Sequence, residues 1–192
     1  MPPDDKETKT MVRQDGTYPS LPLKKDTISV AIAQTRVHGV DGKNPAKDIK
    51  HNLAYMLECI DIAQGYGGKS DLICFHEFPI VGFSNWSREE HYKIAIDVPG
   101  PETEEIGKKC QDYGCYIVFG TYAKDPDWPD HILHLMVLMG PDGNVVAKHW
   151  KQRNVRGLFP GSEQYTSAIY DVYDRFIEMY GEDAVIPVAK TD

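Results

Sequence analysis

Apolar and polar residues follow regular patterns along most of the chain, and these patterns predict strands and helices in alternation. Residues 27–37 carry apolar or small side chains on both faces, which predicts a strand in the centre of a sheet rather than at its edge. Residues 45–64 place apolar side chains at helical spacing behind a proline in the first turn. The short apolar run at residues 71–78 predicts a buried strand. A strand–helix–strand order is typical of a layered α/β fold.

The next part of the chain predicts a second helix and then antiparallel strands. The helix follows the Pro-Gly-Pro segment at residues 99–101, has acidic residues in its first turn and ends at Gly114. A β-branched and aromatic run at residues 115–122 predicts a strand, and residues 132–150 predict a hairpin around a Gly-Pro-Asp-Gly turn. Because a hairpin follows the alternating elements, we expect a mixed sheet rather than a purely parallel one.

The remaining segments complete a single expected domain. Residues 1–26 mix charges with prolines and show no period, so we expect a flexible arm there. Residues 80–90 predict a loop with a short helical turn. Residues 164–180 place apolar side chains at helical spacing and predict a helix, whereas residues 184–188 predict one more strand. We expect one domain over residues 27–192.

Composition agrees with a globular chain that carries an acidic surplus. The 192 residues are 41% hydrophobic and 26% charged, with a formal net charge of −8. An acidic chain without a basic face argues against a nucleic-acid partner and against a polybasic membrane anchor. No run approaches the roughly 18 apolar residues that a membrane span needs, and the N-terminus lacks the apolar core of a secretory signal. We therefore expect a cytoplasmic protein.

The cysteines and histidines show no spacing that is typical of a metal site. The four cysteines form no C-x-x-C pair, and the histidines form no H-x-x-x-H pair. Cys59 and Cys110 fall on the apolar stripes of predicted helices, and Cys115 begins a strand. Cys74 precedes Glu77 by three positions, so we expect its side chain to point to the opposite face of the sheet. All four fit small core residues, and no phosphate-binding glycine loop is present.

Two ionisable residues stand at the ends of predicted strands. Glu77 ends the strand at residues 71–78, and Lys151 ends the second strand of the hairpin. A carboxylate beside an ammonium group in a dry cleft is suited to proton transfer, because the cation stabilises a developing oxyanion. An ordinary ion pair, or two solvated charges, is the alternative that these two residues leave open.

Two segments resemble the signatures of the nitrilase, or carbon–nitrogen hydrolase, superfamily. Residues 71–83 read D-L-I-C-F-H-E-F-P-I-V-G-F and resemble the first signature, in which a strand ends in the catalytic glutamate. Residues 140–151 read G-P-D-G-N-V-V-A-K-H-W-K and are similar to the second, in which a hairpin leads to the catalytic lysine. The separation of 74 positions (151 − 77) resembles the aliphatic-amidase branch. Matches in kind between the two segments extend the resemblance over roughly residues 27–192.

The resemblance implies a fold, a mechanism and a missing residue. The fold is α/β, part of a four-layer α-β-β-α sandwich with a mixed sheet, and the family uses no metal or cofactor. Glu77 would be the general base, and Lys151 would stabilise the tetrahedral intermediate. A cysteine would attack a small amide or nitrile substrate and form a thioester. In the family this cysteine follows a segment resembling residues 185–192, so we expect it beyond Asp192 and expect the isolated chain to be inactive.

The chain also departs from the family pattern. His76 precedes Glu77 where many relatives have proline, and His134 stands where many have asparagine. The second glutamate of several branches has no clear match, because Glu163 lies beyond a Pro-Gly pair. These departures leave the choice of amide or nitrile open.

A non-catalytic scaffold or association domain of the same fold is the alternative function. Part of a sandwich would expose apolar surface, so we expect a homo-oligomer or a complementary chain as partner. A predicted helix rich in tyrosine would serve either association or packing within the chain; its tyrosines are Tyr165, Tyr170, Tyr173 and Tyr180.

Overall fold

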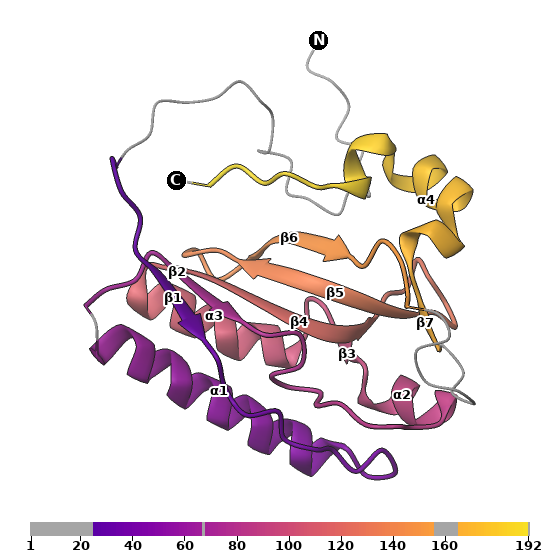
Figure 1. Ribbon diagram of the computed structural model, residues 1–192, viewed down its shortest axis with the longest axis horizontal. Coiled ribbons are helices and arrows are strands. Elements are labelled where there is room, and N and C mark those ends of the chain that lie inside the picture. Colours follow the sequence, from indigo (N-terminus) through magenta and orange to yellow (C-terminus); the bar gives the residue numbers. More distant parts are fainter. Residues whose placement is uncertain (1–24, 67, 156–164, 192) are drawn as a thin grey trace.

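The protein forms a sheet with two helices packed on one face, as seen in a computed structural model that describes residues 25–66, 68–155 and 165–191 (Figure 1). The main strands lie side by side in the order β1 (Val30–Ala33), β2 (Leu72–Phe75), β4 (Tyr116–Lys124), β5 (Ile132–Met139) and β6 (Val145–Trp150). Two short strands join them: β3 (Ile96–Asp97) pairs with β4, and β7 (Thr166–Ser167) pairs with β5. β1, β2 and β4 are parallel, whereas β5 runs antiparallel to β4 and β6. The predicted mixed sheet and hairpin are confirmed.

Helices α1 (Ala46–Tyr66) and α3 (Pro101–Tyr113) cover the same face of the sheet (Figure 1). They are joined by Asp61, which accepts hydrogen bonds from Lys109 Nζ at 2.6 Å and from Tyr113 Oη at 2.7 Å. The short elements are α2 (Arg88–Ile94), α4 (Tyr173–Tyr180) and the 3₁₀ helices η1 (Ile169–Asp171) and η2 (Glu182–Val185). No helix within the described ranges has both the length and the hydropathy needed to cross a bilayer.

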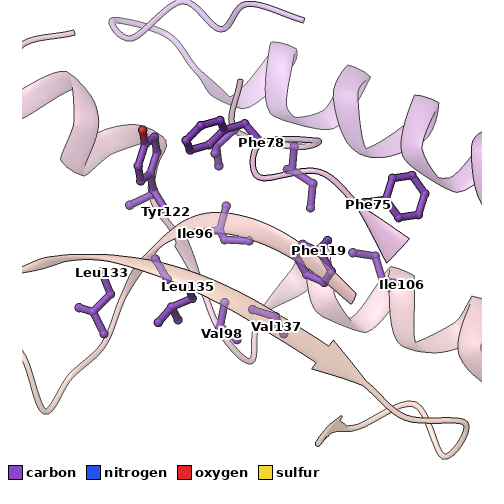
Figure 2. Packing of buried hydrophobic residues seen from close by; sticks show 14 of the residues in the cluster. Phe75, Phe78, Ile96, Val98, Ile106, Phe119, Tyr122, Leu133, Leu135 and Val137 are labelled. Carbon is purple, nitrogen blue, oxygen red and sulfur yellow. The ribbon is translucent and has the colours of Figure 1, made fainter. Parts of the chain in front are cut away.

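The two faces of the sheet differ in burial. On the covered face, toward α1 and α3, the alternate residues of β2, β4 and β5 are buried; Ile73, Phe75, Ile117, Phe119 and Val137 belong to the main core. Figure 2 shows Phe119 and Val137 within this core, together with Ile106 of α3.

The opposite face, here called the open face, carries the alternate residues of the same strands: Val30, Ile32, Cys74, Val118 and Met136. It is far more exposed, and the side chain of Ile32 is 81% accessible. The core therefore lies between the sheet and the helices, and an apolar sheet face remains accessible on the other side.

Three expectations about the ends of the domain are wrong. β1 lies at the edge of the described sheet, not at its centre, and its residues on the open face are exposed. The helix predicted over residues 164–180 is divided into β7, η1 and α4, because Thr166 and Ser167 pair with β5 instead. The predicted strand at residues 184–188 is absent: η2 ends at Val185, whose carbonyl accepts a hydrogen bond from Gln152.

Two further expectations concern the loop at residues 80–90 and the N-terminal arm. The predicted loop at residues 80–90 ends in α2, whose first turn is capped by Ser87 and Glu90. The expected arm at residues 1–26 lies almost wholly outside the described residues, as does Glu163.

Candidate active site

Glu77 lies two residues beyond the end of β2, in a segment pressed against β4. The backbone N–H of Gly120 donates to the carbonyl of His76 at 3.1 Å. A Cβ atom at residue 120 would lie 2.4 Å from the carbonyl oxygen of Glu77, so only glycine permits this close approach. The next residues, Phe78 and Ile80, are buried and anchor the segment on its other side. Glu77 is therefore held at the end of the parallel strands.

His76 stabilises the turn but does not contact the Glu77 carboxylate. Its Nδ1 accepts a hydrogen bond from the backbone N–H of Phe78 at 3.2 Å, and its Nε2 lies 2.9 Å from Thr35 Oγ1. Burial lowers the pKa of His76, which favours the neutral ring that such an arrangement requires. The departure at this position is thus accommodated by local hydrogen bonds.

Lys151 follows β6 and is fixed through its backbone. Its N–H donates to the carbonyl of His134 at 2.8 Å, and its carbonyl accepts from the N–H of Ile169 at 3.0 Å. In the β5–β6 ladder Trp150 lies opposite Leu135, so Lys151 lies opposite His134. Residues of antiparallel strands that lie opposite each other project to the same face, and this places both side chains on the open face.

Two side chains approach the same oxygen of the Glu77 carboxylate. Lys151 Nζ lies 3.3 Å from Glu77 Oε1, and His134 Nε2 lies 2.9 Å from the same atom. The structure therefore brings together Glu77 and Lys151, which are 74 positions apart in the chain. His134 appeared in the sequence only as a departure from the family pattern, and its contact with Glu77 was not predicted.

The imidazole of His134 is buried while the carboxylate that it contacts remains accessible. The side chain of His134 is 8% exposed, against 50% for Glu77. Burial, and then the positive charge of Lys151, lower the pKa of His134 to about 4 against the opposite effect of Glu77. The ring is therefore neutral at pH 7.

Aromatic rings enclose His134. The centroids of Phe78, Tyr122 and His134 form a triangle with separations of 5.0–5.1 Å, and Figure 2 shows Phe78 beside Tyr122. Burial, with a smaller effect of Glu77, raises the pKa of the Tyr122 hydroxyl. Tyr122 therefore stays protonated at neutral pH, and the cluster leaves Glu77 and Lys151 as the charged groups of the site.

None of the four cysteines adjoins Glu77. Cys110 and Cys115 are buried, Cys59 and Cys74 are half-buried, and in each case burial raises the thiol pKa. The expectation that Cys74 and Glu77 lie on opposite faces of the sheet is wrong, because Cys74 pairs with Val118 on the open face, which also carries the site.

The distance along the strands nevertheless separates Cys74 from the site. Its partner Val118 lies four positions before Tyr122, the partner of His134, and four positions amount to roughly 13 Å along a strand.

The other groups named from the sequence lie apart from the carboxylate. Tyr170 and Tyr173 stack at 5.4 Å, and Tyr180 accepts a hydrogen bond from Trp128, so the tyrosines are spread over several contacts rather than one helix face. Within residues 25–66, 68–155 and 165–191, no three His, Cys, Asp or Glu side chains are placed to hold a metal ion.

Relatives named formamidase match part of the chain. The formamidase of Bacillus cereus (strain B4264) is 30% identical over 107 residues, which are 54% of this chain and 31% of the formamidase. The formamidase of Bacillus thuringiensis (strain Al Hakam) is 28% identical over the same length. The aligned stretch thus spans about a third of these curated relatives.

Solved structures share the fold. An N-terminal amidase with a Gln-Gly peptide superposes with a TM-score of 0.57 at 15% identity, over 67% of this chain and 28% of that chain. A CN-hydrolase superfamily protein of Xanthomonas campestris, which carries an arsenic adduct in its active site, gives 0.56 at 20% identity, over 73% and 46%. The C. elegans NitFhit protein gives 0.57 at 17% identity, over 73% and 33%. These likenesses confirm the α/β fold as nitrilase-like.

The family is shown by the sequence as a whole rather than by its motifs alone. The family described as carbon-nitrogen hydrolase matches residues 29–192, which include every described strand and both helices of the covered face. The two segments that resemble its signatures lie within this range and supply Glu77 and Lys151. The chain belongs to the carbon–nitrogen hydrolase family, in the nitrilase superfamily.

Proposed function

We propose that the protein containing this chain hydrolyses non-peptide carbon–nitrogen bonds in small amides or nitriles. One observation carries the proposal: Glu77 Oε1 lies 3.3 Å from Lys151 Nζ at the open face of a carbon–nitrogen hydrolase domain. Relatives named formamidase and N-terminal amidase support an amide as the substrate class.

The geometry suits a base and an electrophilic cation. Glu77 takes the proton of a cysteine thiol as the sulfur attacks the carbonyl carbon, and Lys151 stabilises the oxyanion that forms. The C–N bond then breaks, and the proton passes from Glu77 to the leaving ammonia. Water next adds to the thioester while Glu77 accepts one of its protons; the C–S bond then breaks and Glu77 returns this proton to the sulfur, so that the thiol and a carboxylic acid are released.

The nucleophilic cysteine comes from outside the chain, beyond Asp192. All four cysteines of the chain are placed away from Glu77 in buried or half-buried positions, where burial disfavours the thiolate. The open face has the apolar character of a surface that a further sheet covers in a sandwich. The same exposed face favours the second candidate function, a non-catalytic association domain.

Ammonia release from short amides tests the function. The longer protein is expected to release ammonia, with kcat lowered about 10²- to 10⁴-fold by Glu77→Gln, whereas residues 1–192 alone release none. Glu104→Gln, an exposed carboxylate of α3, is the matched control and leaves kcat unchanged. A longer protein that hydrolyses neither amides nor nitriles contradicts the function. Turnover by residues 1–192 that is lost in Glu77→Gln contradicts the location of the nucleophile.

A further inference from the structure

We propose that His134 is a positioning residue, which donates its Nε2–H to Glu77 Oε1 and so leaves Oε2 as the oxygen that accepts the proton. This inference rests on the proposed function, because it assigns the orientation of the base in that reaction. It names a third member of the site, beside the two residues that the sequence indicates.

The two oxygens of the Glu77 carboxylate have different surroundings. Oε1 lies 2.9 Å from His134 Nε2 and 3.3 Å from Lys151 Nζ. No hydrogen bond from the described residues reaches Oε2. Hydrogen bonds to a carboxylate oxygen stabilise its negative charge, so the oxygen without them is the more basic one. The half-exposed carboxylate therefore presents Oε2 to an incoming proton.

His134 suits this task better than Lys151 because its ring is fixed. The imidazole packs at 5.1 Å from both Phe78 and Tyr122, and it projects from β5 between two paired strands. An ammonium group is instead a point charge on a flexible stem, and it attracts the carboxylate without setting its rotation. The rigid donor sets the direction of the carboxylate, and Lys151 supplies the charge.

The charges around His134 keep it a donor rather than a second cation. The ionisable groups that face it are Glu77 after β2, Tyr122 on β4 and Lys151 after β6. Burial and Lys151 hold the pKa of His134 near 4, so the ring stays uncharged at neutral pH. A neutral imidazole whose Nε2 faces a carboxylate carries its hydrogen on that nitrogen.

The hydrogen bond is measurable without any turnover. Long-range ¹H–¹⁵N correlation spectra of the ¹⁵N-labelled protein at pH 7 are expected to show His134 as the neutral Nε2–H tautomer, with the signal assigned by its loss in His134→Phe. In Glu77→Ala this tautomer preference is expected to weaken. A protonated His134, or one with the hydrogen on Nδ1, overturns the proposal whether or not the protein hydrolyses amides.

Catalysis tests the positioning role itself. His134→Phe keeps the ring packing and removes the donor, so kcat is expected to fall about 10- to 100-fold, with KM nearly unchanged. The acid limb of the kcat/KM profile should move to higher pH, and His134→Gln, which retains an N–H donor, should recover part of the rate. His51→Phe, at an exposed position of α1, is the control.

The outcomes separate the two proposals. A His134→Phe variant with the wild-type kcat and pH profile overturns the positioning role while the proposed function stands. A wild-type protein without amide or nitrile hydrolysis overturns the proposed function, and with it the role of the hydrogen bond in catalysis. In that case the spectra still decide whether the hydrogen bond exists.

Discussion

Two lysines three residues apart at the end of β6 form two very different ion pairs. Lys148 Nζ lies 3.1 Å from Asp125 Oδ2, with side chains only 18% and 13% exposed. Lys151 Nζ lies 3.3 Å from Glu77 Oε1, with side chains 34% and 50% exposed. Because neighbouring residues of a strand alternate between faces, Lys148 lies on the covered face and Lys151 on the open one.

Burial, rather than residue type, separates the two roles. In the pair of Lys148 and Asp125 both charges have lost water, and each compensates the other, so neither is available to a substrate. In the pair of Lys151 and Glu77 both side chains remain accessible to water, so both can take part in the reaction that we propose. The first pair is a structural contact, and the second has the arrangement of a chemical one.

A β-bulge decides which lysine reaches Glu77. Met139 pairs with Val145, but the next pair is Leu138 with Ala147, so Val146 is an extra residue in β6. Without this shift Lys151 would lie opposite Leu133 and project to the covered face, because a slip of one residue exchanges the faces of a strand. The bulge also brings Lys151 opposite His134.

Loss of Lys151 should give the largest effect and should be confined to catalysis. Lys151→Met in a protein that carries the proposed cysteine is expected to lower kcat about 10²- to 10³-fold, because the oxyanion loses its charged partner. The free energy of unfolding should change by no more than about 1 kcal/mol, since the pair is accessible to water. Ammonia release and urea denaturation measure the two quantities. A stability loss as large as the catalytic loss would remove the distinction between the two pairs.

Loss of Lys148 should instead lower the stability and leave catalysis nearly unchanged. Lys148→Met leaves the half-buried Asp125 without its ion-pair partner, and the free energy of unfolding is expected to fall by about 3 kcal/mol. The double variant Lys148→Met/Asp125→Leu should recover most of this loss, while the kcat of the folded fraction stays within a few-fold of wild type. Urea denaturation of the single and double variants measures the difference. Equal stability of Lys148→Met and wild type would show that the half-buried pair is not a structural contact.

A methyl group at residue 120 should disturb the open-face pair through the backbone. In Gly120→Ala the new Cβ meets the Glu77 carbonyl oxygen at 2.4 Å, so the segment must shift, at about 1–3 kcal/mol of stability. The kcat should fall together with the stability, because Glu77 moves. Gly39→Ala is the matched control, since its Cβ meets no atom within 4 Å, and it should stay within about 0.5 kcal/mol of wild type. A Gly120→Ala variant that matches this control would contradict the close approach.

A third pair, between α1 and α3, should give the smallest effect and a pH dependence. Burial alone would raise the pKa of Asp61, but hydrogen bonds from Lys109 and Tyr113 outweigh it and lower the pKa. A lowered pKa means that the stabilisation is complete above the unfolded value of about 3.9 and disappears as pH falls through the folded value.

Asp61→Asn measures this third contribution. The variant should lower the free energy of unfolding by about 0.2–1 kcal/mol at pH 7 and by progressively less below about pH 4. Urea denaturation at several pH values measures this difference. Asp112→Asn, at an exposed position of α3, is the control and should show no such trend. A cost that is constant down to pH 2 would show that the charge of Asp61 does not contribute.

Much of the fold follows from local patterns, whereas the wrong predictions have their cause in contacts with other parts of the chain. The stripe of α1, the acidic start of α3 and the hairpin turn at Gly143 all appear in the sequence, because periodicity and turn chemistry are properties of neighbouring residues. The helix predicted over residues 164–180 failed because strand pairing with β5 outweighed helical spacing at Thr166 and Ser167. β1 resembled a central strand because its apolar residues occur on both faces, although its outer face is exposed here.

The sequence by itself determined the family, the mixed α/β fold and the two charged residues that end their strands, Glu77 and Lys151. Only the tertiary structure decided that these residues meet, that Gly120 allows the approach, and that His134 completes the group. The physical reason is that residue spacing shows which side chains of one helix or strand share a face, but not what that face contacts. The bulge after Leu138, the contact between β4 and the Glu77 segment, and the desolvation of His134 depend on what a distant part of the chain places against them.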